Sequence, residues 1–312
     1  MKARGPFATI VIGLCGMTAS MLAAQAAPRE TVIVRDVRGP EGPLFVGGNL
    51  YFVAYVGSTL SKWDGKTVTV LNDRRDCDHN GLALTARGTF LLACDSDRGA
   101  ILELSLDGKE LRRWDTDSSG KAFDGGMNDI AIAADGGAYV TLTTAAHAPP
   151  GSATGRVYYL PSGGKGWTLA AAGLRDANGI GISPDRKTLY VAETGGNAIQ
   201  KFAINKDGSL SRRALFAQLD QLIANPPGTT RIGPDSFKLD ARGDLYVAQL
   251  LCSRILKISP DGRLLHVFNI AAGVAPTNIA FGPQEKDLYV TVVTAAHTPD
   301  ALGSIVRIPN NK

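Results

Sequence analysis

A short unit of alternating apolar and polar residues recurs along the chain. The copy that runs from Met127 to Val140 reads as an Asn, a short apolar strand, an Asp-Gly turn and a second strand. Alternation with a period of two predicts β-strands, and Asp-Gly between two such runs is typical of hairpins. Six copies follow one another at intervals of roughly 40 to 57 residues, and each opens on a polar residue at the equivalent place: Glu41, Asn80, Asn128, Asn178, Asp235 and Asn278. A repeat of this length built from paired strands predicts propeller blades.

The repeat predicts an all-β fold, a six-bladed β-propeller with one blade closed by strands from both chain ends. Two strand-like segments have no partner within the repeat pattern, Thr31 to Val34 near the start and Ile305 to Ile308 near the end. Pairing them would complete the last blade and remove two exposed sheet edges. The one segment that could form a short helix is the connection from Ala214 to Ala224.

The first 26 residues differ in character from the rest. Lys2 and Arg4 precede an apolar run from Phe7 to about Ala24, and Ala24-Gln25-Ala26 offers a small-x-small cleavage site. This pattern is typical of a secretory signal peptide and is too short and too weakly flanked for a stable transmembrane span. We therefore expect a cleaved leader over residues 1–26, a propeller domain over residues 27–312, and an exported protein, periplasmic or secreted, that does not act at a membrane.

The charge of the chain bears on nucleic-acid binding, and its cysteines bear on a possible disulfide. The net charge falls from +4 to about +2 once Lys2 and Arg4 are removed, and no basic run or aromatic-basic interleaving occurs, so nucleic acid is not an expected partner. A hairpin over residues 82–93 would bring Cys77 and Cys94 together at its open end, where an oxidising compartment would permit a disulfide. The alternative is two unpaired small apolar residues. Cys252 is left over, without a predicted role.

The six opening residues suggest a metal site. The first strand of each propeller blade lines the central channel, so its opening residues converge at one mouth. Carboxylate and amide oxygens around one axis suit Ca²⁺, or another hard divalent cation, better than zinc or copper. Alternatives exist one by one: Glu41 as a solvated turn residue, Asn80-Gly81 and Asn178-Gly179 as type I′ turns, and Asp235 as an Asx-turn residue. Because six polar residues recur at the equivalent position of the repeat, these separate turn interpretations are less favoured together than singly.

The chain resembles the senescence marker protein/gluconolactonase family, to which regucalcin-like proteins belong. The resemblance rests on Glu41-Gly42-Pro43, Asn128-Asp129, Asn178-Gly179 and Pro234-Asp235, and extends over essentially all of the mature chain. It implies a six-bladed propeller with one calcium ion at the top of the channel. The metal ligands carried over by the resemblance are Glu41, Asn128, Asn178 and Asp235.

The reaction that the resemblance implies is hydrolysis of a lactone or related ester. Because calcium acidifies bound water less than zinc does, a separate base is needed, and we assign that role to Asp235. Asn80 and Asp129 are expected to orient the substrate, with a channel hydrogen bond and a structural brace as their alternatives. Gly126 stands where family members acting on sugar lactones often carry an Arg, and Ala54 where an Asp is common, so specificity for sugar lactones does not follow.

Three histidines are further candidates for substrate contact. His147 and His297 lie in two similar loop sequences of blades three and six, which face each other across a six-bladed ring, and His79 adjoins Asn80. The alternative for each is a histidine tied to the backbone. His266 lies in a predicted strand and is interpreted as a packing residue.

Two other functions stay open. The first is a non-catalytic ligand-binding propeller in which calcium only rigidifies the channel. The second is a phosphotriesterase-like or strictosidine-synthase-like enzyme on the same scaffold. No Gly-x-Ser-x-Gly, His-Glu-x-x-His or phosphate-loop motif occurs, which excludes the hydrolases and nucleotide-binding proteins that carry those motifs.

Overall fold

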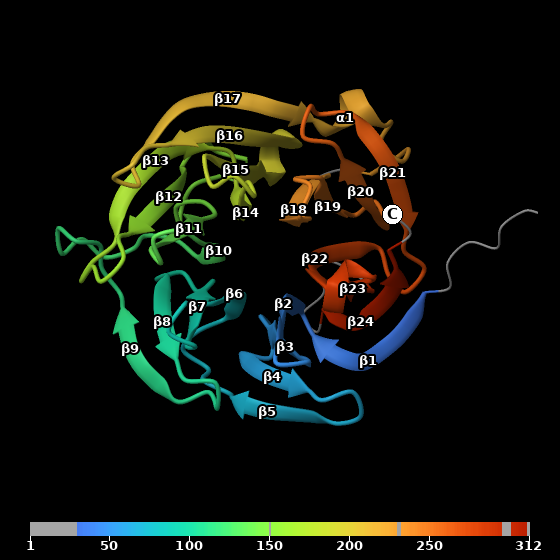
Figure 1. Ribbon diagram of the computed structural model, residues 1–312, viewed down its shortest axis with the longest axis horizontal. Helices are drawn as coiled ribbons and strands as arrows, with labels where there is room; N and C mark the ends of the chain where they lie inside the picture. Colours follow the sequence, from blue (N-terminus) through green and yellow to red (C-terminus); the bar gives the residue numbers. More distant parts are fainter. Residues whose placement is uncertain (1–29, 150, 230–231, 295–300, 311–312) are drawn as a thin grey trace, which may run out of the picture.

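The computed structural model describes residues 30–149, 151–229, 232–294 and 301–310. These residues form a ring of six four-stranded antiparallel sheets around a central axis (Figure 1). In five sheets the strands are hydrogen-bonded in chain order, and in the sixth the first strand of the chain joins the last three. The prediction of an all-β, six-bladed propeller is confirmed.

The blades use consecutive strands, from the axis outward. Blades one to three comprise β2 (Pro40–Val46), β3 (Asn49–Ala54), β4 (Thr59–Trp63) and β5 (Val68–Asn72); β6 (His79–Leu84), β7 (Phe90–Cys94), β8 (Ala100–Leu104) and β9 (Glu110–Trp114); and β10 (Met127–Ile132), β11 (Ala138–Leu142), β12 (Gly155–Leu160) and β13 (Thr168–Leu174). Blades four to six comprise β14 (Ala177–Ile182), β15 (Thr188–Glu193), β16 (Ala198–Ile204) and β17 (Leu210–Gln218); β18 (Gly233–Leu239), β19 (Leu245–Leu250), β20 (Arg254–Ile258) and β21 (Leu264–Asn269); and β22 (Ala275–Phe281), β23 (Asp287–Val293), β24 (Leu302–Pro309) and β1 (Thr31–Arg38).

Both chain ends meet in blade six. β1 pairs antiparallel with β24, with Thr31 opposite Arg307 and Val32 opposite Val306. This closure confirms the prediction for the two terminal segments. The helix considered between Ala214 and Ala224 is largely wrong, because β17 stays paired with β16 as far as Gln218 and only one helical turn, α1 (Leu219–Leu222), follows.

The core consists of apolar layers between neighbouring blades. On β7, Phe90 and Leu92 pack toward blade one, whereas Leu91 and Ala93 pack toward blade three. Both faces of a middle strand are therefore buried, which is why its sequence is apolar at every position rather than at every second one.

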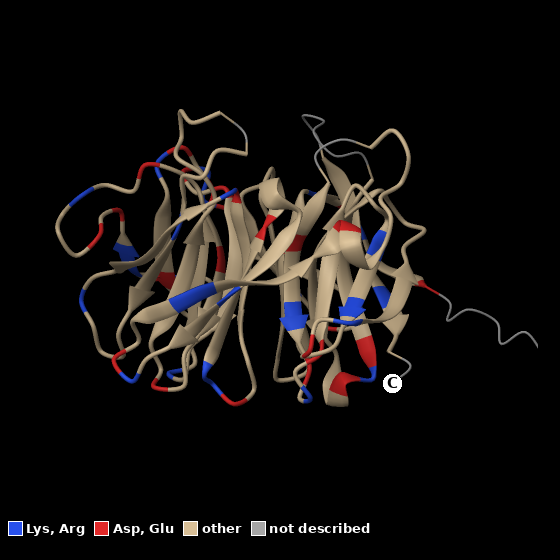
Figure 2. Cartoon of the chain, turned by 90° about the horizontal axis from the view of Figure 1, so that it is seen from above, with Lys and Arg blue, Asp and Glu red and all other residues tan. Residues whose placement is uncertain are grey.

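Charged residues lie mainly away from these layers. In the side view many of them occupy the loops at the two ends of the strands (Figure 2). Within the residues that the structure describes, no helix has the length and apolar character needed to cross a membrane.

Candidate active site at one mouth of the central channel

Every inner strand carries a β-bulge next to the polar residue that opens its blade. In β6, His79 pairs with Cys94 and Leu82 with Leu92, so three steps along β6 match two along β7. The same excess of one residue occurs in β2, β10, β14, β18 and β22. A bulge bends its strand and re-aims a side chain. The bulges recur at the same place in the inner strands and therefore give the opening residues of blades one to five a common orientation relative to the axis.

The Asn-Gly pairs belong to strands and not to hairpin turns. Asn80-Gly81 lies inside β6 and Asn178-Gly179 inside β14. A Cβ atom on Gly81 would lie 2.3 Å from the carbonyl oxygen of Asn128 in the next blade. A Cβ atom on Gly179 would lie 2.6 Å from Cα of Ser236. In blades two and four, glycine follows the opening residue because the neighbouring inner strand approaches too closely for a side chain.

Five of the six predicted opening residues line one cavity. The cavity has a volume of about 220 Å³, which corresponds to roughly seven water molecules at about 30 Å³ each. Its lining residues are Glu41, Tyr55, Asn80, Asp95, Asn128, Thr143, Asn178, Asp235, Leu250, Ala275, Thr277 and Val293. All the aliphatic ones come from blades five and six, so the cavity has an apolar side facing a polar one.

Glu41 is held rigidly at the edge of blade one. The residue is only 3% exposed to solvent. Its Oε2 accepts hydrogen bonds of 2.8 Å from the Gly42 amide and from Nδ2 of Asn278. Burial raises the pKa of Glu41 to about 7, although both hydrogen bonds and Lys238 act in the opposite direction. A charged Glu41 in this place therefore calls for a cation.

Asp235 is the second buried carboxylate of the cavity. Burial raises its pKa well above the ordinary value, and the negative charge of Glu41 raises it further. Asn178 opposes this rise through a side-chain hydrogen bond. The amide of Asn178 is also held by Thr194, whose hydroxyl accepts from Nδ2 at 3.1 Å and donates to the Pro234 carbonyl at 2.7 Å.

The residues fit a hard divalent cation. Glu41 and Asp235 supply carboxylate oxygens, and Asn128 and Asn178 supply amide oxygens, from four different blades. Among the residues that the structure describes, no Lys, Arg or His lines the cavity to balance the carboxylates, and a cation would relieve the repulsion that raises their pKa values. Among the described residues, no three or more His, Cys, Asp and Glu side chains gather closely enough to hold a metal ion. Two of the four candidate ligands here are asparagines.

Asn80 and Asp129, both predicted to bind substrate, lie in different surroundings. Asn80 lines the cavity and donates from Nδ2 to Oδ2 of Asp95 at 3.1 Å. Asp129 is outside the lining, with Oδ1 accepting from the Ile130 amide at 2.8 Å and Oδ2 from the Ser236 hydroxyl at 2.5 Å. Asp129 follows Asn128 directly, and consecutive strand residues point to opposite sides, so its position is that of the structural brace.

Asp129 also faces the other end of the channel. Lys238 donates to its Oδ2 at 3.3 Å and lines a second cavity of about 420 Å³. That larger cavity is bounded by the apolar middle parts of all six inner strands, with Arg186 as its other cation. None of the described residues that line it is an Asp or Glu, so the smaller cavity is the candidate for catalysis.

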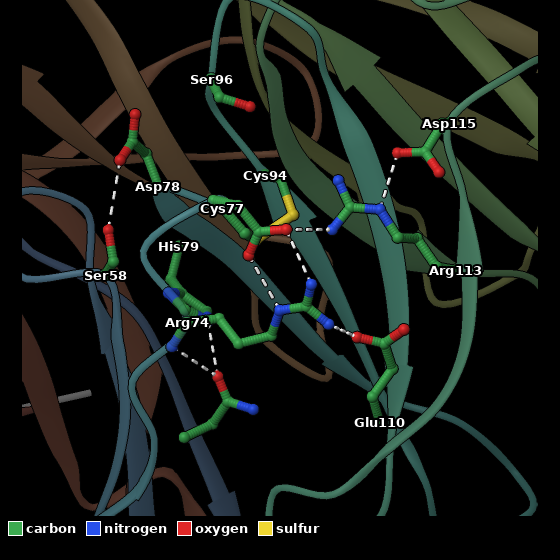
Figure 3. The surroundings of a disulfide bond; sticks show 12 residues. Ser58, Arg74, Cys77, Asp78, His79, Cys94, Ser96, Glu110, Arg113 and Asp115 are labelled. Atoms are coloured by element: carbon green, nitrogen blue, oxygen red, sulfur yellow. Dashed lines mark hydrogen bonds and ion pairs between the residues drawn. A yellow bond between two sulfur atoms is a disulfide. The ribbon is translucent and has the colours of Figure 1, made fainter.

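His79 lies beside a disulfide and outside the cavity lining. Cys77 and Cys94 are bonded, joining the segment before β6 to the end of β7 (Figure 3). The His79 ring is fully buried, with Nε2 3.2 Å from Oδ1 of Asn72, and burial lowers its pKa to about 4. His79 precedes Asn80 in the strand and therefore points to the opposite side.

An ion-pair cluster covers the same disulfide (Figure 3). Arg74 bridges Asp76 and Glu110, and Arg113 bridges Asp76 and Asp115. The Arg74 guanidinium holds the pKa of Asp76 down at about 2. The cluster ties the Cys77 segment to β9 and so supports the loop that leads into β6.

The two loop histidines are not part of the observed lining. His147 is exposed in the loop after β11, and its role stays a prediction. His297 lies outside the described residues. His266 is exposed on β21, where its ring contacts Phe268 edge-on with centroids 4.5 Å apart.

Blade six departs from the predicted phase by one residue. Thr277, and not Asn278, lines the cavity. Thr277 is the residue within the bulge of β22, between Pro276 and Asn278, whereas the next residue, Asn278, donates from Nδ2 to Glu41. Asn278 is a positioning residue for that carboxylate, with its own Oδ1 accepting from the Ile279 amide.

Besides Thr277 and the aliphatic residues of the lining, three polar lining residues escaped the sequence analysis. Tyr55, Asp95 and Thr143 each follow the second strand of a blade. In an antiparallel pair the end of the second strand lies beside the beginning of the first, and this relation was the signal that could have found them. Burial raises the pKa of Tyr55 above its usual range, and burial with the charge of Asp78 raises that of Asp95 to about 7.

Fold and site together define a six-bladed propeller with an oxygen-rich cavity at one channel mouth. The family profile described as SMP-30/Gluconolactonase/LRE-like region matches residues 39–294. The chain belongs to this family, and the resemblance inferred from its sequence is confirmed.

The relatives of the chain include hydrolases of two kinds. A 6-deoxy-6-sulfogluconolactonase of Pseudomonas putida is 30% identical over 116 residues, which is 37% of this chain and 37% of that protein. Diisopropyl-fluorophosphatase of Loligo vulgaris is 24% identical over 287 residues, covering 85% of this chain and 88% of that protein. The solved structure of XC5397, a gluconolactonase from Xanthomonas campestris, has a TM-score of 0.70 and 27% identity over 92% of this chain and 93% of its own.

Proposed function

We propose that this protein is an exported, calcium-dependent hydrolase that opens a lactone or related ester in the cavity at the channel mouth. The observation that carries the proposal is the convergence of Glu41, Asn128, Asn178 and Asp235, from four blades, on one cavity whose described lining has no basic side chain. The lactonases and the fluorophosphatase among its relatives support a hydrolase.

The residues that would hold the ion are these same four. Calcium, when bound, supplies a Lewis acid for the carbonyl oxygen of the substrate. Asn278 and the Gly42 amide keep Glu41 in place, and Thr194 keeps Asn178 in place. Hydrogen bonds from the surrounding structure therefore hold two of the four ligands, Glu41 and Asn178, in place.

Asp235 is assigned the proton transfer. Its carboxylate orients a water molecule and accepts a proton as the water oxygen bonds to the carbonyl carbon. The bond from that carbon to the ring oxygen then breaks, and the proton passes to the departing oxygen to give a hydroxy acid. The aliphatic side of the cavity, which includes Leu250 and Val293, excludes bulk water from the ring of the substrate.

The bonded Cys77–Cys94 pair supports export, since disulfides persist in oxidising compartments. The predicted leader, residues 1–26, lies outside the described residues. Sequencing the amino terminus of the protein recovered from a native-like secreting host tests both the cleavage and the compartment.

The function is tested by acid release from sugar, aliphatic and aromatic lactones, and by fluoride release from a fluorophosphate triester. Each assay is run with calcium, with a chelator and after calcium is restored. Calcium-dependent turnover of a lactone supports the proposal, and turnover of the triester alone would assign a phosphotriesterase. Absence of turnover on every substrate, with calcium still raising the unfolding temperature, would contradict the proposal in favour of a binding propeller.

The matched variants are Asp235→Asn and Asp261→Asn. Asp235→Asn is expected to lower kcat by at least a hundredfold, because the general base is lost. Asp261 lies in an exposed hairpin turn between β20 and β21, so its variant controls for the loss of a carboxylate. Full activity in Asp235→Asn would remove Asp235 as the base.

A further inference from the structure

One part of the cavity wall has no role in holding the cation or moving the proton. Asp95 and Thr143 lie on either side of Gly126. A Cβ atom on Gly126 would lie 1.8 Å from Oδ1 of Asp95, and the Thr143 amide donates to the Gly126 carbonyl at 3.0 Å. Asp95 therefore occupies the space that a side chain at position 126 would need.

The Thr143 hydroxyl is ready for a ligand. Its oxygen is buried and has no hydrogen-bond partner among the described residues. Buried polar atoms are nearly always paired, and Thr143 belongs to the cavity lining. A hydroxyl group of a bound molecule would satisfy it.

Asp95 is positioned by contacts that leave it room to accept a further hydrogen bond. Asn80 donates to Oδ2 at 3.1 Å, and the Asp95 amide donates to the Asp78 carbonyl at 2.7 Å. The preceding residue, Cys94, is fixed by its disulfide. A carboxylate held in this way is a specific acceptor for a hydroxyl group.

The charge of the cavity opposes anions. Asp95 is a third carboxylate beside Glu41 and Asp235, and the described part of the chain contributes no cationic side chain to the lining. One divalent cation would leave a negative formal charge. A carboxylate, sulfonate or phosphate on the substrate would meet that charge at short range in a partly desolvated site.

Resting on the function proposed above, we propose that Asp95 and Thr143 are specificity residues that select an uncharged, polyhydroxylated, single-ring lactone and exclude its anionic analogues. The volume of about 220 Å³ suits one ring with its substituents. The hydroxyl groups face Asp95 and Thr143, and the C–H face of the ring lies toward Leu250, Ala275 and Val293 of the opposite, aliphatic side.

The test compares a neutral hydroxylated six-membered lactone with its analogue carrying a carboxylate on the exocyclic carbon. Values of kcat/KM are measured at pH 8 with calcium, after subtraction of spontaneous hydrolysis. Asp95→Asn is expected to lower kcat/KM for the neutral lactone about tenfold, through loss of a charge-assisted hydrogen bond. It is expected to raise kcat/KM for the anionic lactone about tenfold, through loss of one repelling charge.

Two further variants separate the causes. Thr143→Val preserves shape and charge, and is expected to lower kcat/KM for the neutral lactone several-fold while the anionic lactone gains nothing. Asp97→Asn removes the same charge from an exposed position in the same loop and is expected to leave the ratio of the two values unchanged. An unchanged ratio in Asp95→Asn, or an equal change in Asp97→Asn, would overturn the inference.

Failure of the proposed function gives a different result. If the wild-type protein hydrolyses neither lactone, the hydrolase assignment fails, and the specificity is measured by calorimetry with a neutral 1,5-anhydro sugar and its carboxylate. Preference for the neutral sugar, lost in Asp95→Asn, supports the inference. Equal binding of both sugars, or binding of neither, overturns it.

Discussion

The buried imidazole of His79 makes the stability of blade two dependent on pH. Burial lowers its pKa from 6.5 to about 4. Between these values the unfolded chain binds a proton that the folded protein does not, so folding stability falls as pH falls. At one pKa unit per 1.36 kcal/mol, this group alone removes about 3 kcal/mol of unfolding free energy between pH 7 and pH 4.

The carboxylates of the cavity act with the opposite sign. Burial raises the pKa values of Glu41 and Asp95 to about 7, so the folded protein holds protons that the unfolded chain has lost above about pH 4.5. Their contribution to stability is present at low pH and falls as pH rises toward 7. The wild-type pH profile therefore mixes both effects, and only a comparison with a variant isolates His79.

The assay is urea unfolding of wild type and His79→Gln at half-unit steps from pH 4 to pH 7, with the disulfide intact and calcium held constant. The unfolding free energy of wild type minus that of the variant is expected to decrease by about 3 kcal/mol from pH 7 to pH 4. His266→Gln, on the exposed face of β21, controls for the replacement of an imidazole. A difference constant to within about 0.5 kcal/mol across this range would refute a buried neutral His79.

Three further perturbations test the site and its support. Asn278→Ala should lower the unfolding free energy by about 1 to 3 kcal/mol, because Glu41 loses a buried hydrogen bond; urea titration checks this, and a loss below about 0.3 kcal/mol would contradict the contact. Replacing Cys77 and Cys94 together by Ala should lower the unfolding free energy by about 3 kcal/mol, since the bridge closes a separation of 17 residues. The wild-type protein is also unfolded in reducing and in non-reducing buffer, and equal unfolding midpoints would exclude the bond. Calcium at a hundredfold excess over its dissociation constant should raise the unfolding free energy by roughly 3 kcal/mol. This gain is measured by comparing unfolding with calcium and with a chelator. An equal gain in Glu41→Gln would mean that the ion binds elsewhere.

The alternation of apolar and polar residues and the spacing of the repeats determine the six-bladed architecture. Strand, Asp-Gly turn and strand are decided by neighbours in sequence, and six copies of one unit can bury their apolar faces only against one another. Closure by both chain ends follows from the leftover strands at each end. For the same reason the phase of the polar residues identified Glu41, Asn80, Asn128, Asn178 and Asp235 as one group before any contact was known.

Tertiary structure alone decided which atoms face the cavity. In β22 the residue that lines the cavity is Thr277, whereas the next residue, Asn278, donates to Glu41. The polar pattern does not distinguish these two neighbours, although consecutive strand residues point to opposite sides. Asp95 and Thr143 enter the site through the packing of blade two on blade three around Gly126. Contacts between strands of different blades depend on how closely those strands pack, and the sequence of a single strand does not specify that distance.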